Sequence, residues 1–150
     1  MLLKLHDWFN KHLTQHEVPT AHTVELATAV LLYEVMRADH KLDAQEQAVY
    51  RQQLESHFSL DIDELNVLCE LTSKHVDEAV DFHQFTRLIN DSCDAKQKRS
   101  IMDSLWRVAF ADHDLSADEE YTIRKIADLL YIPHSLFIQS KLAAQDLQEP

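Results

Sequence analysis

Hydrophobic residues recur along this chain with the period of an α-helix, and no stretch shows the sustained alternation of a β-strand. In three segments they fall at positions i, i+3, i+4 and i+7, which places them on one face of a helix. These residues are Leu65, Leu68, Cys69 and Thr72; Phe82, Phe85, Thr86 and Ile89; and Ile123, Ile126, Ala127 and Leu130. The pattern predicts an all-α fold.

Two further segments, 24–36 and 101–110, are apolar on nearly every side, which is typical of helices buried in the centre of a domain. Helix starts are indicated by capping boxes, in which a short polar residue is followed three positions later by Glu or Gln. The pairs are Asp43 with Glu46, Asp94 with Gln97, and Ser116 with Glu119. Pro133 lies where a last helix could begin.

We therefore expect a single compact domain of about eight helices over residues 1–150. The predicted helices span 2–13, 20–39, 44–57, 63–77, 82–92, 95–111, 117–130 and 134–146. The chain contains no glycine and only three prolines. Because sheets use glycine in tight turns and bulges, this composition favours helices joined by short polar connections.

The formal net charge of −12, from 26 acidic and 14 basic residues, argues against nucleic acid as a partner, since phosphate backbones would be repelled. The densest basic stretch is Lys96, Lys98 and Arg99, which we interpret as a solvated helix face. The N-terminal residues have neither a long apolar core nor a small-residue cleavage site. We expect a cytoplasmic protein without stable membrane insertion.

The sequence carries no nucleophile elbow, phosphate-binding loop or zinc-protease motif, so we expect a protein that is not an enzyme. Its two cysteines, Cys69 and Cys93, stand outside any CxxC pair. We expect both to be reduced, buried thiols, because neither a disulfide framework nor a thiolate zinc site has support.

The most informative feature is an internal match between residues 38–46 and 111–119, at an offset of 73 residues (112 − 39). Six of the nine positions are identical: Ala, Asp, His, Leu, Ala and Glu. Upstream, Leu32, Tyr33 and Val35 align at the same offset with Leu105, Trp106 and Val108. A match of this length with matching flanks predicts an internal duplication, with halves at approximately 20–77 and 95–146.

A long apolar helix followed by an Ala-Asp-x-x-Leu-x-x-x-Glu loop, occurring twice, resembles the pattern of the TerB (tellurite-resistance protein B) family. The residues that carry the resemblance are Glu34, Ala38, Asp39, Leu42 and Glu46 in the first copy, and Ala111, Asp112, Leu115 and Glu119 in the second. The chain has His40 and His113 where the family pattern has glycine, and Arg107 where the first copy has Glu34.

The resemblance implies an all-helical fold with two helix–loop–helix repeats related by a pseudo-twofold axis. It also implies a non-enzymatic accessory role in bacterial stress response and tellurite resistance, with acidic loop residues that hold a metal. The same module stands beside co-chaperones in other proteins, which implies protein–protein interaction as an alternative.

The duplicated acidic loops allow two interpretations. In the structural one, Asp43 and Ser116 are N-caps and Glu46 and Glu119 complete capping boxes, each cap stabilising its helix by about 1 kcal/mol. His40 and His113 would then occupy a left-handed position at the helix end.

In the metal-binding interpretation, Asp39 and Asp112 end helices, where the helix dipole disfavours a carboxylate and invites a cation. The ligand sets would be Asp39, Asp43 and Glu46 in the first copy, and Asp112, Asp114 and Glu119 in the second. Oxygen ligands suit Ca²⁺, Mg²⁺ or Mn²⁺, whereas a contribution from His40 or His113 would favour Zn²⁺, Mn²⁺ or Ni²⁺; Glu34 is a weaker candidate. Other proteins are the expected partners under either interpretation.

Overall fold

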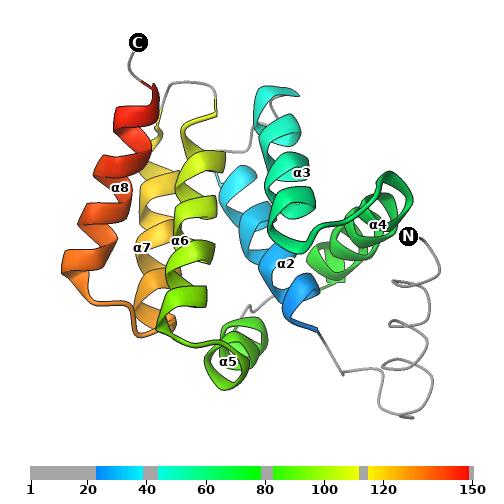
Figure 1. Ribbon diagram of the computed structural model, residues 1–150, viewed down its shortest axis with the longest axis horizontal. Helices are drawn as coiled ribbons and strands as arrows, with labels where there is room; N and C mark the ends of the chain where they lie inside the picture. The colour runs from blue at the N-terminus through cyan, green and yellow to red at the C-terminus, as the bar shows by residue number, and fades with distance from the viewer. Residues whose placement is uncertain (1–22, 39–43, 79–82, 112–114, 149–150) are drawn as a thin grey trace.

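The computed structural model describes residues 23–38, 44–78, 83–111 and 115–148, and these residues form seven helices and no strand (Figure 1). The helices are α2 (Val24–Met36), α3 (Ala44–Phe58), α4 (Ile62–Glu78), α5 (His83–Ser92), α6 (Ala95–Ala109), α7 (Ala117–Leu129) and α8 (His134–Gln148). The prediction of a single compact all-α domain is confirmed, with seven helices in the described part rather than about eight. The helix predicted at 2–13 lies outside the described residues.

Helix α2 is the centre of the domain and contacts α3, α4, α5, α6 and α7. Nine of its thirteen residues are buried, including Ala27 and Ala29, which are completely inaccessible to solvent. These small side chains let neighbouring helices approach closely, while Leu31, Leu32 and Val35 fill the space between them. The prediction of a central helix from an all-round apolar segment is confirmed.

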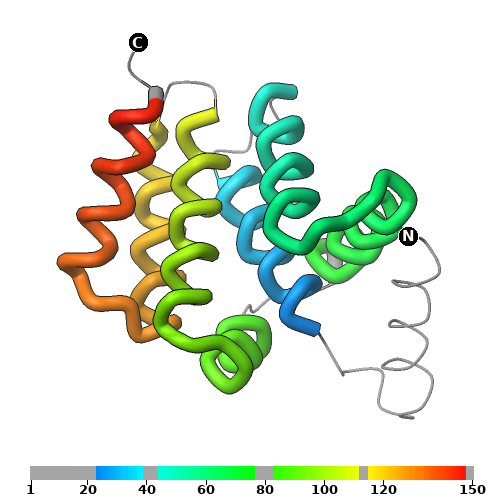
Figure 2. Tube along the Cα trace, in the orientation of Figure 1, coloured from blue at the N-terminus to red at the C-terminus, as the bar shows by residue number. Residues whose placement is uncertain are grey.

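Helix α6 is the central helix of the second half, where it contacts α7 and α8. Across the middle of the molecule α2 packs against α6, α3 reaches α6, and α2 reaches α7. Helix α5, at the lower edge of the view, packs against both α2 and α7 and so joins the two halves (Figure 2).

Helices α2 and α6 end earlier than predicted, and in almost the same geometry. Their C-cap residues, Arg37 and Phe110, have φ/ψ of −94°/2° and −91°/5°. In α2 the Arg37 and Ala38 amides donate to the carbonyls of Tyr33 and Val35, and α6 repeats both bonds 73 residues later. The predicted ends at 39 and 111 lie three and two residues beyond the observed ends. The predicted start of α2 at 20 lies four residues before Val24, whose N-cap is Thr23.

This correction bears on the predicted metal site. Asp39 and Asp112 follow the last helical residues, Met36 and Ala109, by three positions. Because the field of a helix dipole falls off within the last turn, an aspartate in that place no longer demands a counter-ion on electrostatic grounds.

Helices α3 and α7 also end alike, each on a residue in the left-handed region: Ser59 (φ 55°) and Tyr131 (φ 60°). The next amide in each half, that of Leu60 or Ile132, donates to a carbonyl five residues earlier at 3.1 or 2.9 Å. This is the hydrogen bond of a Schellman motif, in which glycine is the usual residue. A chain without glycine thus places serine and tyrosine in positions that favour it.

Three capping boxes organise the helix starts in the described part of the chain. Two of them, Asp94 with Gln97 and Ser116 with Glu119, were predicted and are confirmed. The third was missed: Asp61 and Glu64 exchange backbone-to-side-chain bonds of 3.0 and 2.9 Å at the start of α4. The predicted Asp43 cap lies outside the described residues.

Candidate functional site

Each half of the molecule contains one completely buried glutamate directly after its acidic loop. Glu46 is the third residue of α3 and Glu119 the third residue of α7, and both have an exposed fraction of 0%. The other predicted ligands of the two loops lie outside the described residues: Asp39, His40, Asp43, Asp112, His113 and Asp114. Within the described ranges no group of three or more His, Cys, Asp or Glu side chains is placed to hold a metal ion.

Glu119 completes the capping box of α7. Its Oε1 accepts a hydrogen bond from the Ser116 amide at 3.0 Å, and the Ser116 hydroxyl accepts one from the Glu119 amide at 3.0 Å. Leu115, just before the cap, is partly buried and packs against the core. Glu64, in the third position of α4, is also 97% buried within a capping box, so a buried capping glutamate occurs in this fold outside the acidic loops as well.

Glu34, the weaker metal candidate, forms an ion pair with Arg37 of its own helix at 2.8 Å. In the second half the corresponding residue is Arg107, which donates to Oε1 of Gln53 on α3 at 3.3 Å. Gln53 also accepts a hydrogen bond from Ser104 at 3.1 Å. The replacement of Glu34 by Arg107 in the second half therefore provides a hydrogen bond between α6 and α3.

A cavity of about 160 Å³ lies between α2, α3 and α4. Its lining residues are Tyr33, Met36, Gln47, Tyr50, Arg51 and Cys69. The Tyr33 and Tyr50 rings meet edge to face at 5.8 Å. Burial raises the pKa of the Tyr50 hydroxyl and of the Cys69 thiol, so both groups stay protonated and are poor nucleophiles at neutral pH.

The corresponding place in the second half is lined differently, by Ala117, Glu120, Tyr121 and Arg124. Trp106 occupies the position of Tyr33, and its ring packs against Phe110 and Phe137 at 6.0 and 5.2 Å. Glu120 occupies the position of Gln47 and pairs with Lys141 of α8 at 3.0 Å. The two halves thus share a backbone plan and differ in how their helices are packed.

Both cysteines are free thiols. They are half-buried rather than fully buried, which corrects the prediction in part. Burial raises the pKa of Cys93 as it does that of Cys69, and a protonated thiol is a weak nucleophile and a weak metal ligand.

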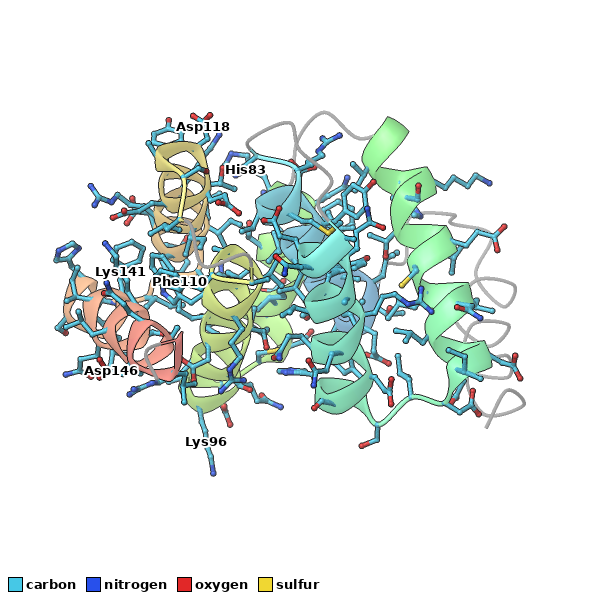
Figure 3. All side chains as sticks on the ribbon, turned by 90° about the horizontal axis from the view of Figure 1, so that it is seen from above. His83, Lys96, Phe110, Asp118, Lys141 and Asp146 are labelled. Carbon is cyan, nitrogen blue, oxygen red and sulfur yellow. The ribbon has the colours of Figure 1, made fainter. Side chains whose placement is uncertain are left out.

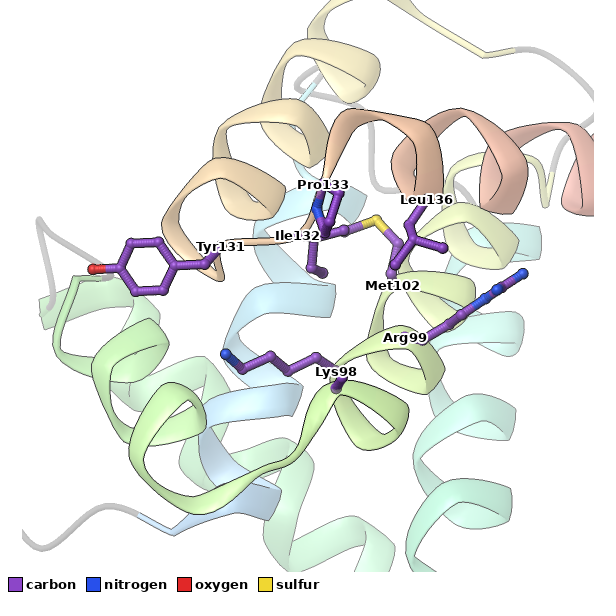
Figure 4. Close-up of a pocket in the computed structure, with 8 residues that line it drawn as sticks. Lys98, Arg99, Met102, Tyr131, Ile132, Pro133 and Leu136 are labelled. Atoms are coloured by element: carbon purple, nitrogen blue, oxygen red, sulfur yellow. The ribbon is translucent and has the colours of Figure 1, made fainter.

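Sequence reasoning missed a second pocket, formed by the start of α6, the α7–α8 turn and the first turn of α8 (Figure 4). The sequence feature that could have indicated this pocket is the basic stretch of α6, which we interpreted as a solvated helix face. That interpretation fits Lys96, which is exposed and projects away from the helix start (Figure 3). It was wrong for Lys98, which is half-buried and donates a hydrogen bond to the Leu130 carbonyl at 3.2 Å.

These features define a small all-helical domain in which two central helices each lead through a short loop to a helix with a buried glutamate. The comparison with protein families agrees: the family described as "Tellurite resistance protein TerB" matches residues 25–142. The chain belongs to the TerB family. No curated protein and no solved structure matches it significantly. None of the described helices combines the length and the apolar character needed to cross a membrane.

Proposed function

We propose that this protein is a non-enzymatic, cytoplasmic accessory protein of stress and tellurite resistance that binds a divalent cation at its duplicated acidic loops. The ligands would be Asp39, Asp43 and Glu46 in the first half, and Asp112, Asp114 and Glu119 in the second. The observation that carries the proposal is that Glu46 and Glu119, 73 residues apart, are both completely buried next to these loops.

A buried carboxylate must be compensated, because transfer of an ionised group out of water is strongly unfavourable. A capping box supplies one backbone N–H, as it does for Glu119. A carboxylate can accept that bond with one oxygen and bind a cation with the other. A capping box gives the glutamate one hydrogen bond and has no role for Asp112 and Asp114, which a cation would use as ligands.

The proposal includes descent of the two halves from a duplicated unit. Three structural features support it in addition to the sequence match: the equal helix ends at Arg37 and Phe110, the left-handed residues Ser59 and Tyr131, and the buried glutamates. A duplicated unit predicts two cations per chain, one for each loop.

The test is thermal unfolding of the untagged protein with added Ca²⁺, Mg²⁺, Mn²⁺ or Zn²⁺, together with its metal content by mass spectrometry. A cation present at 100 times its dissociation constant should stabilise the native state by about 2.7 kcal/mol. We expect the Asp39→Asn, Asp112→Asn double variant to lose this shift. The matched control is Asp63→Asn, Asp118→Asn, which removes two exposed first-turn acids outside the loops.

A second variant separates capping from metal binding. Gln97 completes the capping box of α6, so glutamine can do the capping work of a glutamate in this fold. Glu119→Gln should therefore fold normally and lose the cation shift of its loop, whereas Glu64→Gln should keep it. If no ion shifts the unfolding of the wild type, or if Glu119→Gln responds as the wild type does, the metal site does not exist.

The alternative function is a helical module for protein–protein interaction with purely structural loops. One observation favours it: the apolar pocket at the opposite end of α6, which has basic side chains at its rim.

A further inference from the structure

The pocket between α6 and α8 has an apolar floor. Met102, of which 1% is exposed, lies between Pro133 and Leu136, and Ile132 completes the apolar lining (Figure 4). Its volume is about 120 Å³. An apolar cavity of about 150 Å³ can hold benzene, so this pocket has room for one apolar side chain.

Two cations flank this floor. Figure 4 shows Lys98 extending toward Tyr131 and Arg99 extending the other way. In the described part of the chain no ion pair is recorded for either, and the first turn of α6 carries no acidic side chain. The N-cap of α6 is itself acidic, because Asp94 accepts a hydrogen bond from the Gln97 amide there. The positive charge at the pocket therefore comes from Lys98 and Arg99, on a protein with a net charge of −12.

Tyr131 forms the lip of the pocket. It has φ 60°, a conformation that costs a non-glycine residue about 1–2 kcal/mol, and 79% of it is exposed. The Lys98 ammonium group lies 5.8 Å from the centre of its ring. An exposed tyrosine held in an unfavourable conformation beside an apolar hole is the kind of anchor that protein interfaces use.

We propose that this pocket docks a peptide segment of a partner protein that carries one aliphatic or aromatic side chain next to carboxylates. The apolar side chain enters the pocket against Met102 and Leu136, and the carboxylates meet Lys98 and Arg99. The charge complementarity selects an acidic segment. The volume selects a single side chain over a lipid acyl chain, which is several times larger.

This inference deepens the alternative function and is independent of the metal proposal. The pocket lies at the start of α6 and the acidic loop follows its end, about 20 Å away along a 15-residue helix. Variants of one site therefore leave the other intact.

The experiment is selection of a random heptapeptide library displayed on phage against the wild-type protein. We expect enriched peptides in which aspartate or glutamate flanks one leucine, isoleucine or phenylalanine. A synthetic peptide of the enriched sequence is then titrated by fluorescence anisotropy. Its affinity should fall as salt is added, because exposed charge pairs are screened.

Two pairs of variants test the geometry. Arg99→Glu should weaken the peptide about fivefold, whereas Lys96→Glu, the same charge reversal three residues earlier and outside the pocket, should have little effect. Tyr131→Gly should weaken it about tenfold through loss of the anchor. Ser59→Gly makes the same backbone change at the equivalent position of the first half and should leave the affinity unchanged.

Glycine adopts the left-handed conformation without a steric penalty, so Tyr131→Gly and Ser59→Gly should fold. They keep the test valid even if Arg99→Glu harms folding. The proposal is overturned if selection yields no acidic–apolar consensus, or if the selected peptide binds Tyr131→Gly and Arg99→Glu as it binds the wild type. It is also overturned if the wild type lacks peptide affinity and instead floats with phosphatidylserine-containing vesicles.

Discussion

At the scale of single residues, the absence of glycine has a structural consequence. Helices α3 and α7 both need a left-handed residue to end, and the chain supplies Ser59 and Tyr131. A serine at such a position is small, whereas an exposed tyrosine there is unusual and stands beside an apolar pocket. Strain in this protein thus coincides with the surface for which we propose a partner.

The strain can be measured by comparison of Tyr131→Gly with Tyr131→Ala. Both remove the ring and its contact with Lys98, but only glycine adopts a positive φ without a steric penalty. We expect the glycine variant to be more stable than the alanine variant by about 1 kcal/mol in urea-induced unfolding. Equal stabilities would mean that the backbone at residue 131 is unstrained.

At the scale of elements, the two central helices decide the packing. Helix α2 is buried on nearly every side and uses alanines where other helices cross it. Helix α6 is largely buried from Ile101 to its end, whereas its first turns are not, and the basic residues Lys96 and Arg99 there remain exposed. The two helices match in sequence but differ in how much of their surface is buried, because α2 and α6 pack against different sets of helices.

The packing of α2 makes it sensitive to added volume. Ala27→Leu inserts three carbon atoms at a completely buried position, and we expect a loss of about 1–3 kcal/mol in unfolding free energy. Ala143→Leu on the exposed side of α8 is the matched control and should change stability by less than about 0.5 kcal/mol. If Ala27→Leu leaves the unfolding free energy unchanged, the centre of the domain is loosely packed.

At the scale of the whole molecule, the halves are joined by polar contacts between α3 and α6 as well as by the core. Gln53 accepts hydrogen bonds from Ser104 and Arg107, and His57 lies 3.5 Å from the Ser100 hydroxyl. Burial lowers the pKa of His57 below its usual 6.5, because the charged imidazolium is less well solvated there.

A lowered histidine pKa destabilises the folded state in acid. The unfolded chain takes up a proton near pH 6.5, whereas the folded chain resists it, so stability falls as the pH drops below that value. Between about pH 7.5 and pH 5, the melting temperature of the wild type should fall more than that of His57→Gln. His134→Gln, at an exposed position, should behave as the wild type does. If His57→Gln has the same pH profile as the wild type, His57 does not contribute.

The candidate metal site was reached from the sequence only in part. The Ser116–Glu119 capping box followed from residue types and spacing, because a cap needs only its own four residues. Complete burial of Glu46 and Glu119 did not follow, since it depends on the helices that pack over them. The dipole argument for Asp39 and Asp112 failed because the helices stop three residues earlier, and helix ends are the least certain feature of a hydrophobic pattern.

The sequence by itself determined the helices from α3 to α8 to within two residues, since apolar period and capping residues are local properties. The matched loops also led from the sequence to the TerB family, which the family comparison then showed. Tertiary structure alone decided the pocket: residues 95–102 and 131–136 form it only because α8 folds back onto the start of α6. A cavity arises from side chains far apart in the chain, and no periodicity along one helix can specify it.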